Sequence, residues 1–187
     1  MKIVLASASP RRRELLSMVC KDFSVRISNT NESYNGEAVD EWIRTLAKNK
    51  AYGVCASDDE IVIGCDTVVV NGGKILGKPR DRAEAISMLK SMSNASHEVI
   101  TGVCVKRGDF YCTDAVVTTV HMRELSLSEI EKYVDTCAPY DKAGAYGIQE
   151  MAGAFVTRIE GDYFNIVGLP LCRLTEIFKE QFGVSLI

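Results

Sequence analysis

Three consecutive arginines, Arg11 to Arg13, lie where the sequence predicts the beginning of a helix. Ser9 is expected to be the N-cap of this helix, and Pro10 occupies its first position. The first turn of a helix carries partial positive charge, so each cation there costs about 0.3–1 kcal/mol. Free helix N–H groups and planar guanidinium groups both bind phosphate oxygens, so a bound polyphosphate would turn this repulsion into cooperation.

A simpler interpretation is that these long side chains extend into solvent, which is what we expect of Arg13. Arg11 and Arg12 are then the candidates for binding a polyanion such as a nucleoside triphosphate. The helix-dipole argument also makes a prediction about stability. Replacing Arg12 with alanine should weaken triphosphate use and slightly stabilise the ligand-free protein.

Two carboxylates are candidates for catalysis or metal binding. Asp66 follows the apolar run 61–65, where we expect a buried strand to end or bend, and ligands bind off such strand ends in open α/β sheets. A carboxylate in an apolar run is costly unless it is paired or bound to a metal. The alternative for Asp66 is a turn residue that bonds its own backbone. Glu32 lies in a polar loop, and its alternative is a solvated surface residue.

Two lysines and one loop could also contact phosphate. Lys50 lies on a predicted helix, where the alternative is a solvated lysine. Residues 72–79, "GGKILGKP", match the G-x-x-x-x-G-K spacing of a P-loop, but Pro79 stands where a Ser or Thr and a helix are required. Lys78 therefore stays a candidate only as a phosphate contact from a rigid turn. The small residues in "DKAGAYGIQ", 141–149, allow the backbone to approach a ligand closely.

Helical and strand periodicities alternate along the chain and predict a mixed α/β (α+β) fold without internal repeats. We expect strands at 2–6, 23–27 and 61–70, the last interrupted at 64–66; helices at 10–19, 38–57 and 81–92; a turn at 71–74; a hairpin of 97–107 with 110–120; a helix from a Ser128-x-x-Glu131 capping box to 137; a hairpin at 154–168; and a last helix from Leu169-Pro170 to 182.

The composition is that of an ordinary globular protein of one domain, or of one domain with two lobes. The chain has 187 residues, of which 47% are hydrophobic and 25% charged, and its net charge of −3 argues against a broad nucleic-acid surface. No apolar run approaches the length of a membrane span, and we expect no signal peptide, because the N-terminal residues lack its apolar core region. The seven cysteines show no C-x-x-C spacing, which favours reduced thiols, no zinc site and a cytoplasmic location.

Several stretches together resemble a known family, the Maf septum-formation-inhibitor-like nucleoside triphosphate pyrophosphatases. They occur in family order: "LASASPRRRELL", "LAKNKA", "GCDTVV", "LGKPRDRAEAISML", "HEVITGV", "DKAGAYGIQ" and "GDYFNIVGLPL". The resemblance implies a single domain, 1–187, with a mixed twisted sheet, flanking helices and two lobes around a cleft, similar to inosine triphosphate pyrophosphatases. It also implies hydrolysis of a nucleoside triphosphate to the monophosphate and pyrophosphate, a divalent metal (Mg²⁺ or Mn²⁺), and a homodimer.

The resemblance also implies roles for individual residues of this chain. Asp66 matches the catalytic aspartate, and whether it takes a proton or orients metal and water stays open. The other matches are phosphate contacts at Ser9, Arg11, Arg12, Lys50 and Lys78; metal ligands at Glu32 and Asp66; and substrate specificity at Arg11, Thr67 and Gln149.

"DT" at 66–67 and "YGIQ" at 146–149 resemble the subgroup that acts on dTTP and UTP. The amide of Gln149 can meet both O4 and N3–H of uracil or thymine, but a flipped amide also serves cytosine. A second group must therefore fix it, such as Thr67 or the backbone of residues 143–147. The chain departs from the family pattern at Cys65, where Ala is usual, and at Glu150, where Gly is common and which adds a negative charge beside Gln149.

Two alternatives to an enzyme stay open at this point. A regulatory protein could sense a nucleotide in cell division with little turnover, and an RNA-binding protein could use the arginine run. The second is disfavoured by the net charge and by the lack of an aromatic-rich basic stretch. If the enzyme interpretation is correct, removal of modified nucleotides is a further expectation.

Overall fold

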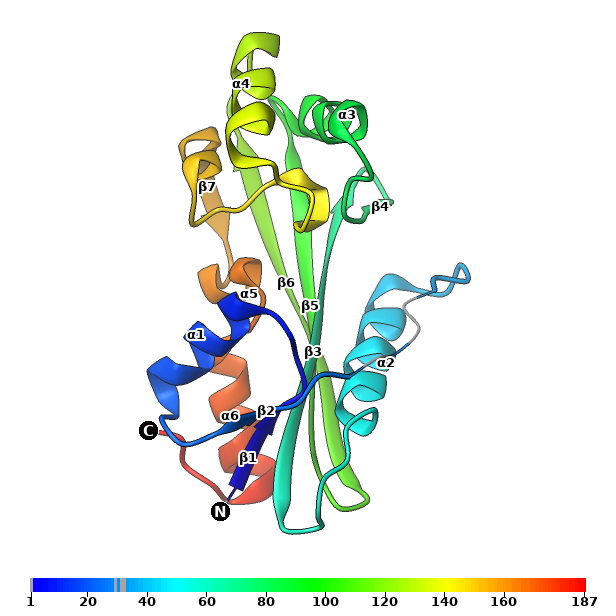
Figure 1. The fold of residues 1–187 in the computed structure, drawn as a ribbon, viewed down its shortest axis with the longest axis vertical. Coiled ribbons are helices and arrows are strands. Elements are labelled where there is room, and N and C mark those ends of the chain that lie inside the picture. The colour runs from blue at the N-terminus through cyan, green and yellow to red at the C-terminus, as the bar shows by residue number, and fades with distance from the viewer. Residues whose placement is uncertain (1, 29, 31–32) are drawn as a thin grey trace. The chain divides into compact units, whose positions relative to one another are not determined.

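The computed structural model describes residues 2–28, 30 and 33–187, and its centre is a seven-stranded mixed sheet (Figure 1). The strands run in the order β2-β1-β3-β5-β6-β7, and β4 pairs with β3 off this path. This confirms the expected mixed α/β class. The strands are β1 (Lys2–Leu5), β2 (Ser24–Val25), β3 (Glu60–Asn71), β4 (Lys74–Leu76), β5 (Ser96–Arg107), β6 (Phe110–Met122) and β7 (Val156–Glu160). The helices are α1 (Pro10–Val19), α2 (Val39–Tyr52), α3 (Arg82–Met92), α4 (Leu127–Cys137), α5 (Tyr163–Val167) and α6 (Leu171–Phe182), with 3₁₀ turns η1 (Ala143–Ala145) and η2 (Met151–Phe155).

The chain forms two compact units. Unit 1 comprises Met1–Thr67, Thr101–Val116 and Gly168–Ile187, and unit 2 comprises Val68–Ile100 and Val117–Val167. Strands β3, β5 and β6 continue from one unit into the other, and in β3 the boundary follows Thr67.

In unit 1, helix α2 lies directly on the sheet because two strand residues there have no side chain. A Cβ atom on Gly64 of β3 would lie 2.3 Å from the carbonyl oxygen of Ala47, and one on Gly102 of β5 would lie 2.3 Å from that of Ile43. Helices α1 and α6 contact each other on the other side of these strands (Figure 1). This close packing fixes the position of α2, and with it Lys50, relative to β3.

The helix starts follow from local capping. Ser9 caps α1 as predicted, since its Oγ accepts a hydrogen bond from the Arg12 N–H at 3.4 Å. The capping box of α4 is Ser126 with Glu129, not Ser128 with Glu131, so that prediction was wrong by two residues. The sequence contains the Ser-x-x-Glu spacing twice in succession, and only the first pair has both reciprocal hydrogen bonds.

Three other predicted elements differ from the structure. Residues 154–168 do not form a hairpin: β7 pairs with β6, and Asp162 then accepts a hydrogen bond from the Phe164 N–H at the start of the short helix α5. Helix α2 ends at Tyr52 instead of continuing to residue 57. Strand β3 is continuous from Glu60 to Asn71, so Asp66 lies within a strand and not at its end.

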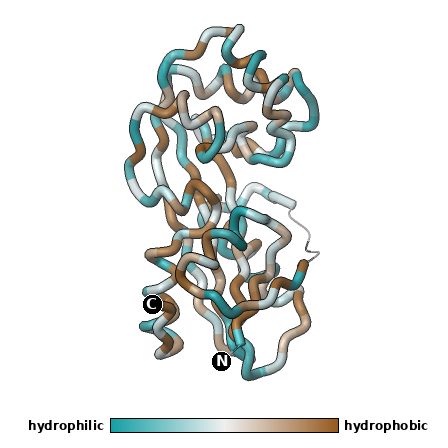
Figure 2. The backbone as a smooth tube through the Cα atoms, turned by 60° about the vertical axis from the view of Figure 1, so that its left-hand side comes forward, coloured by the Kyte–Doolittle hydropathy of each residue, from teal (hydrophilic) through white to brown (hydrophobic). Residues whose placement is uncertain are grey.

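Unit 2 has an apolar cluster of its own. Helices α3 and α4 contact each other, and residues of both pack with β3, β5, β6 and the two 3₁₀ turns. Hydrophobic and hydrophilic stretches alternate along the tube in each unit, as expected when every element turns one face to a core (Figure 2). Across residues 2–28, 30 and 33–187, no helix has the length and apolar character needed to cross a membrane.

Candidate active site

Four side chains of unit 1, Arg12, Lys50, Asp66 and Thr67, form what we call the Asp66 cluster. Lys50 Nζ lies 3.0 Å from Asp66 Oδ2, and Arg12 Nη2 lies 3.6 Å from Asp66 Oδ1. The same Oδ1 accepts the backbone N–H of Thr67 at 2.9 Å. The exposed fractions of the three charged side chains are only 11%, 11% and 15%. The structure thus brings together one carboxylate and two cations that the sequence places on three separate elements.

Arg12 is held by several hydrogen bonds. Its Nε donates to the carbonyl oxygen of Gly168 at 2.8 Å, Nη1 donates to Ser7 Oγ at 3.3 Å, and Nη2 donates to Thr67 Oγ1 at 3.0 Å. The residue is 9% exposed. Replacing it with alanine would remove this donor from the carbonyl oxygen of Gly168 and one hydrogen bond each from Ser7 Oγ and Thr67 Oγ1. We therefore expect the lost hydrogen bonds to outweigh the relief of helix-dipole repulsion, so that the variant is destabilised instead of slightly stabilised.

Thr67 connects Arg12 to a second, fully buried hydroxyl. Thr67 Oγ1 accepts from Arg12 and lies 2.9 Å from the Oγ1 of Thr101 on β5, with either hydroxyl able to donate between the two threonines. Gly168 lies against the side chains of both Arg12 and Thr67. Its φ of +119° favours glycine, and a Cβ there would lie 3.4 Å from both Arg12 Nε and Thr67 Oγ1.

The electrostatics of the Asp66 cluster favour an anion. Among the described side chains, two cations face one carboxylate, so Arg12, Lys50 and Asp66 together carry a formal charge of +1, and Arg12 lies in the first turn of α1, where the N–H dipoles add to it. Low exposure strengthens each of these interactions relative to bulk water. The arrangement can therefore hold a phosphate group near a carboxylate that is fixed on a sheet strand.

The remaining predicted residues have different environments. Ser9 uses its hydroxyl to cap α1, Arg11 is half-buried, and Arg13 is exposed. Lys78 and Gln149 belong to unit 2 and are both exposed. Glu32 lies outside the described residues.

Residues 141–150 of unit 2, which we call the Gln149 loop, are irregular but well bonded. The N–H of Gly144, where φ is +68°, donates to the carbonyl oxygen of Gly77 at 3.0 Å, next to Lys78. The N–H of Gly147 donates to Tyr133 Oη at 3.3 Å. The segments that carry Lys78 and Gln149 are thus tied to each other within unit 2.

His97 also holds this loop, a role that no chemical pattern in the sequence indicated. Its Nε2 lies 2.8 Å from Tyr146 Oη, and the two rings meet edge to face. Burial lowers the pKa of His97 to about 4, with a smaller contribution from His121, and burial raises the pKa of Tyr146. In the sequence, a histidine within a predicted strand cannot be told from a residue of the core. The contact with Tyr146 in the structure shows that His97 helps to hold the Gln149 loop.

The described residues offer few side chains that could bind a divalent cation. No group of three or more His, Cys, Asp or Glu side chains suited to holding a metal occurs among residues 2–28, 30 and 33–187. Mg²⁺ commonly binds through one or two carboxylates, with substrate phosphates and water completing its shell. Asp66 fits that requirement as the protein ligand of a metal carried by a triphosphate.

Cys65, the neighbour of Asp66, is fully buried. Burial raises the pKa of its thiol, while the charges of Arg12 and Lys50 oppose that shift. All seven cysteines are free.

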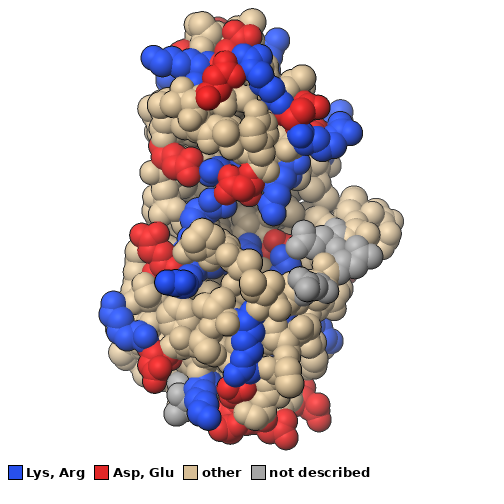
Figure 3. Space-filling model, in the orientation of Figure 1, with Lys and Arg blue, Asp and Glu red and all other residues tan. Residues whose placement is uncertain are grey.

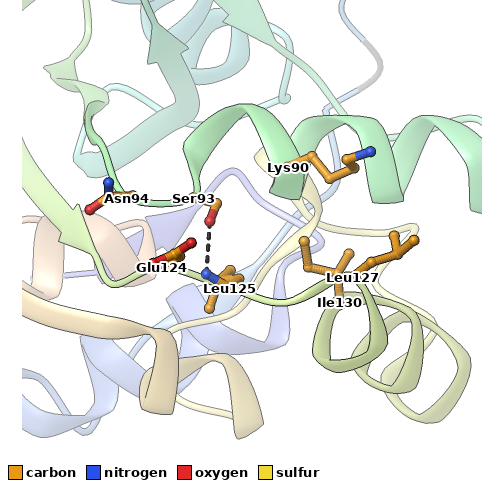
Figure 4. Close-up of a pocket in the computed structure, with 7 residues that line it drawn as sticks. All are labelled: Lys90, Ser93, Asn94, Glu124, Leu125, Leu127 and Ile130. Atoms are coloured by element: carbon orange, nitrogen blue, oxygen red, sulfur yellow. Dashed lines mark hydrogen bonds between the residues drawn. The ribbon is translucent and has the colours of Figure 1, made fainter.

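Unit 2 has a surface depression of about 300 Å³, and none of the residues that line it is a predicted site residue (Figure 4). It is lined by Lys90 and Glu124, which offset each other in charge, and by apolar Leu125 and Leu127. The Ser93 hydroxyl there already accepts the N–H of Leu125 at 2.8 Å. It therefore lacks the excess positive charge that distinguishes the Asp66 cluster.

Comparisons with known proteins assign the chain to a family. A family model described as Maf-like protein matches residues 2–181. A dTTP/UTP pyrophosphatase of Clostridium novyi (strain NT) is 46% identical over 193 residues, and one of Thermoanaerobacter sp. (strain X514) is 48% identical over 191, each match covering both chains completely. One of Hahella chejuensis (strain KCTC 2396) is 44% identical, covering 99% of this chain and 94% of its own. The chain belongs to the Maf-like protein family.

A solved structure shows a weaker similarity. The Staphylococcus aureus Ham1 protein matches 65% of this chain and 72% of its own, with 14% identity and a TM-score of 0.46. A score below 0.5 adds nothing to the family assignment.

Proposed function

We propose that this protein hydrolyses nucleoside triphosphates, dTTP and UTP preferentially, to the monophosphate and pyrophosphate. The observation that carries the proposal is the Asp66 cluster, in which a half-buried carboxylate on a strand lies between the cations of Lys50 and Arg12. The full-length relatives at 46% and 48% identity, which are named dTTP/UTP pyrophosphatases, support the substrate assignment.

In the proposed reaction, water attacks the α-phosphorus while the bond to the β-phosphate oxygen breaks. Asp66 accepts the hydrogen bond and the proton of this water, and pyrophosphate leaves. Lys50 and Arg12 balance the charge that builds on the phosphates, which is the largest contribution expected from a fixed polar site. Lys78 and Arg11 are assigned to the remaining phosphate charges.

A divalent cation is part of the proposal, with Asp66 and Glu32 as the residues assigned to hold it. When bound, Mg²⁺ or Mn²⁺ supplies Lewis acidity to the phosphate oxygens. Recognition of the nucleobase is assigned to Gln149. Its NH₂ group donates to O4 of uracil or thymine, and its carbonyl oxygen accepts from N3–H. Once a second group, such as Thr67 or the backbone of residues 143–147, fixes the orientation of this amide, cytosine presents the reverse pattern, and the unpaired groups cost about 10–200-fold in kcat/KM.

The test is a panel of dTTP, UTP, CTP, dGTP, GTP, ITP and 7-methyl-GTP at equal concentration with Mg²⁺ or Mn²⁺. We expect pyrophosphate and the monophosphate as products, formed fastest from dTTP and UTP. Gln149→Glu should reduce the preference for uracil and thymine, because an ionised Glu has no donor for O4. Release of inorganic phosphate in place of pyrophosphate would overturn the reaction, and faster hydrolysis of CTP or a purine nucleotide would overturn the base assignment.

The alternative function, nucleotide sensing in cell division without turnover, is an outcome of the same assay. Tight binding of dTTP or UTP, measured by calorimetry, together with no product over hours would support it. Hydrolysis by wild type that is lost in Asp66→Asn supports the enzyme.

Four broader expectations belong to the proposal. Residues 1–187 act as one catalytic domain, which the continuity of β3, β5 and β6 supports. A cytoplasmic location is supported by the seven free thiols. The absence of nucleic-acid partners is supported by the net charge of −3 and by the mixture of Lys and Arg with Asp and Glu on the face in Figure 3. A homodimer follows from the family resemblance, and light scattering would measure it.

A further inference from the structure

A buried lysine crosses the Gln149 loop. Lys142 Nζ lies 2.8 Å from Asp141 Oδ1 and 3.3 Å from Glu150 Oε1. The Lys142 side chain is 9% exposed, while those of its partners are 61% and 40% exposed. A buried ammonium group needs such partners, so we expect Lys142 to hold both carboxylates close to its Nζ.

Gly147 provides the path for this lysine. A Cβ atom on Gly147 would lie 2.9 Å from Lys142 Cε and 3.1 Å from its Cδ, and 3.3 Å from the Cδ of Glu150. The lysine stem therefore passes against the backbone of Gly147 to reach Glu150. The side chain connects the beginning of the loop to its end, on the far side of Gln149 in the sequence.

The ion pair acts on the part of the loop that other contacts leave least constrained. Up to Gly147, the loop is held by Gly77, His97 and Tyr133. After Gly147, the described hydrogen bonds are the Glu150 N–H to the Gly147 carbonyl at 3.1 Å and the Gly153 N–H to the Glu150 carbonyl at 2.9 Å. Ile148 packs against the apolar cluster of unit 2, and the Lys142–Glu150 ion pair ties the end of the loop to its beginning.

The direction in which the Glu150 carboxylate turns matters for base selection. A carboxylate accepts well from the amino group of cytosine, and it repels the O4 acceptor of uracil and thymine. Glu150 directly follows Gln149, so a carboxylate released from Lys142 would compete with the Gln149 amide and favour the wrong base.

We propose that Lys142 is a specificity-determining residue that captures the Glu150 carboxylate and so keeps it from accepting a hydrogen bond from cytosine beside Gln149. The inference rests on the proposed function, in which Gln149 contacts the base. Lys142 is a positioning residue, because it acts through Glu150 and the loop backbone.

The test measures kcat/KM for UTP, dTTP and CTP in four proteins: wild type, Lys142→Met, Glu150→Gln and the double variant. Met has a stem of similar length that fits beside Gly147 but carries no charge. We expect Lys142→Met to lower the UTP:CTP ratio about 10-fold, within the range that one mispaired group produces. Glu150→Gln and the double variant should keep a ratio within about 2-fold of wild type, because neither has a carboxylate to release.

Asp141→Asn is the matched control. It removes the other carboxylate partner of the same lysine, on the exposed side of the loop, and leaves the Lys142–Glu150 pair in place. The UTP:CTP ratio should stay unchanged. A purely structural role of Lys142 predicts a different result, namely an equal loss for all three nucleotides together with a lower Tm and no recovery in the double variant.

Gly147→Ala tests the same geometry without changing any charge, and it serves if Lys142→Met does not fold. Gly147 is not among the glycines with positive φ, so alanine is allowed, but its Cβ must displace the flexible lysine stem. We expect the UTP:CTP ratio to fall about 3-fold.

The outcomes separate the inference from the proposed function. If wild type releases no pyrophosphate, or does not prefer UTP to CTP, the proposed function fails. If wild type prefers UTP and both folded variants, Lys142→Met and Gly147→Ala, keep that preference within 2-fold, the inference alone is overturned.

Discussion

The Asp66 cluster and the Gln149 loop hold their functional side chains in different ways. Asp66 lies within a twelve-residue strand, and its partners come from two helices that pack against that strand. Gln149 lies on irregular backbone that is fixed through side chains, namely Tyr146 to His97, Tyr133 to Gly147 and Lys142 to Glu150. Regular backbone positions the proposed chemistry, whereas individual side-chain contacts position the proposed base recognition.

This difference predicts that substitutions in the two regions have different consequences. Changes at Arg12, Lys50 or Asp66 should reduce turnover of every nucleotide, since phosphates are common to all substrates. Changes in the contacts of the Gln149 loop should alter the relative rates among nucleotides.

Asp66→Asn should lower kcat about 10²–10⁴-fold for every nucleotide, since the amide cannot accept the proton of the attacking water. The Tm should also fall, because Lys50 and Arg12 then lack their shared carboxylate. Pyrophosphate release measures the first effect and circular dichroism the second. Asp135→Asn, an exposed carboxylate of unit 2 paired with Arg82, is the control and should match wild type. If Asp66→Asn keeps more than half of the wild-type rate, Asp66 has a structural role and the proposed mechanism is wrong.

Gly64→Ala should destabilise the protein by about 3 kcal/mol, because its Cβ would lie 2.3 Å from the Ala47 carbonyl oxygen and 2.6 Å from the Ala51 nitrogen. Both are backbone atoms, so α2 must move, and Lys50 moves with it. Denaturant unfolding measures the change. Gly77→Ala is the control for stability, because nothing lies within 4 Å of its Cβ position. Equal stability of the two variants would show that α2 adapts without cost.

Arg12→Ala should lower the free energy of unfolding by about 2–3 kcal/mol and reduce kcat/KM for all nucleotides together. It removes donors from the carbonyl oxygen of Gly168 and from the hydroxyls of Ser7 and Thr67. The neighbouring Arg13→Ala is exposed and should change stability by no more than about 0.5 kcal/mol. A more stable Arg12→Ala protein would restore the helix-dipole explanation.

The His97 contact predicts a pH dependence of stability. Its folded pKa of about 4 lies below the ordinary value, so the unfolded chain binds more protons between about pH 6.5 and 4. Stability from this residue is therefore complete above pH 6.5 and is lost as the pH falls, by about 2 kcal/mol at pH 5. His97→Gln should show a flatter pH profile of Tm over this range, while His121→Gln, which is more exposed, should keep the slope. Parallel profiles for wild type and His97→Gln would contradict the assignment.

Local signals in the sequence sufficed for much of the fold. The cap at Ser9, the helix predicted at 81–92 and the hairpin of 97–107 with 110–120 all depend on neighbouring residues, and each is confirmed. Ambiguous or long-range features failed. Two overlapping capping patterns at Ser126 and Ser128 could be separated only by the hydrogen bonds made, and the continuity of β3 past Asp66 depends on pairing with distant strands.

The candidate site shows the same limit. The residue types at Asp66, Lys50 and Arg12 indicated phosphate chemistry, but their convergence depends on the packing of α1 and α2 against the sheet. Thr101 and His97 were missed because a buried threonine or histidine in a strand pattern looks like a core residue. Likewise, the charge of Glu150 could be weighed only once Lys142 was seen beside it.

The burial of Cys65 has a consequence for resistance to oxidants. A thiol beside the carboxylate of Asp66 and two cations would react readily in an open site, because neighbouring positive charge stabilises the thiolate. Burial outweighs those charges here and keeps the sulfur protonated, so peroxide or alkylating agents should modify the exposed Cys55 and Cys172 first. The enzyme we propose can therefore carry sulfur next to its reaction centre through oxidative stress without losing activity there.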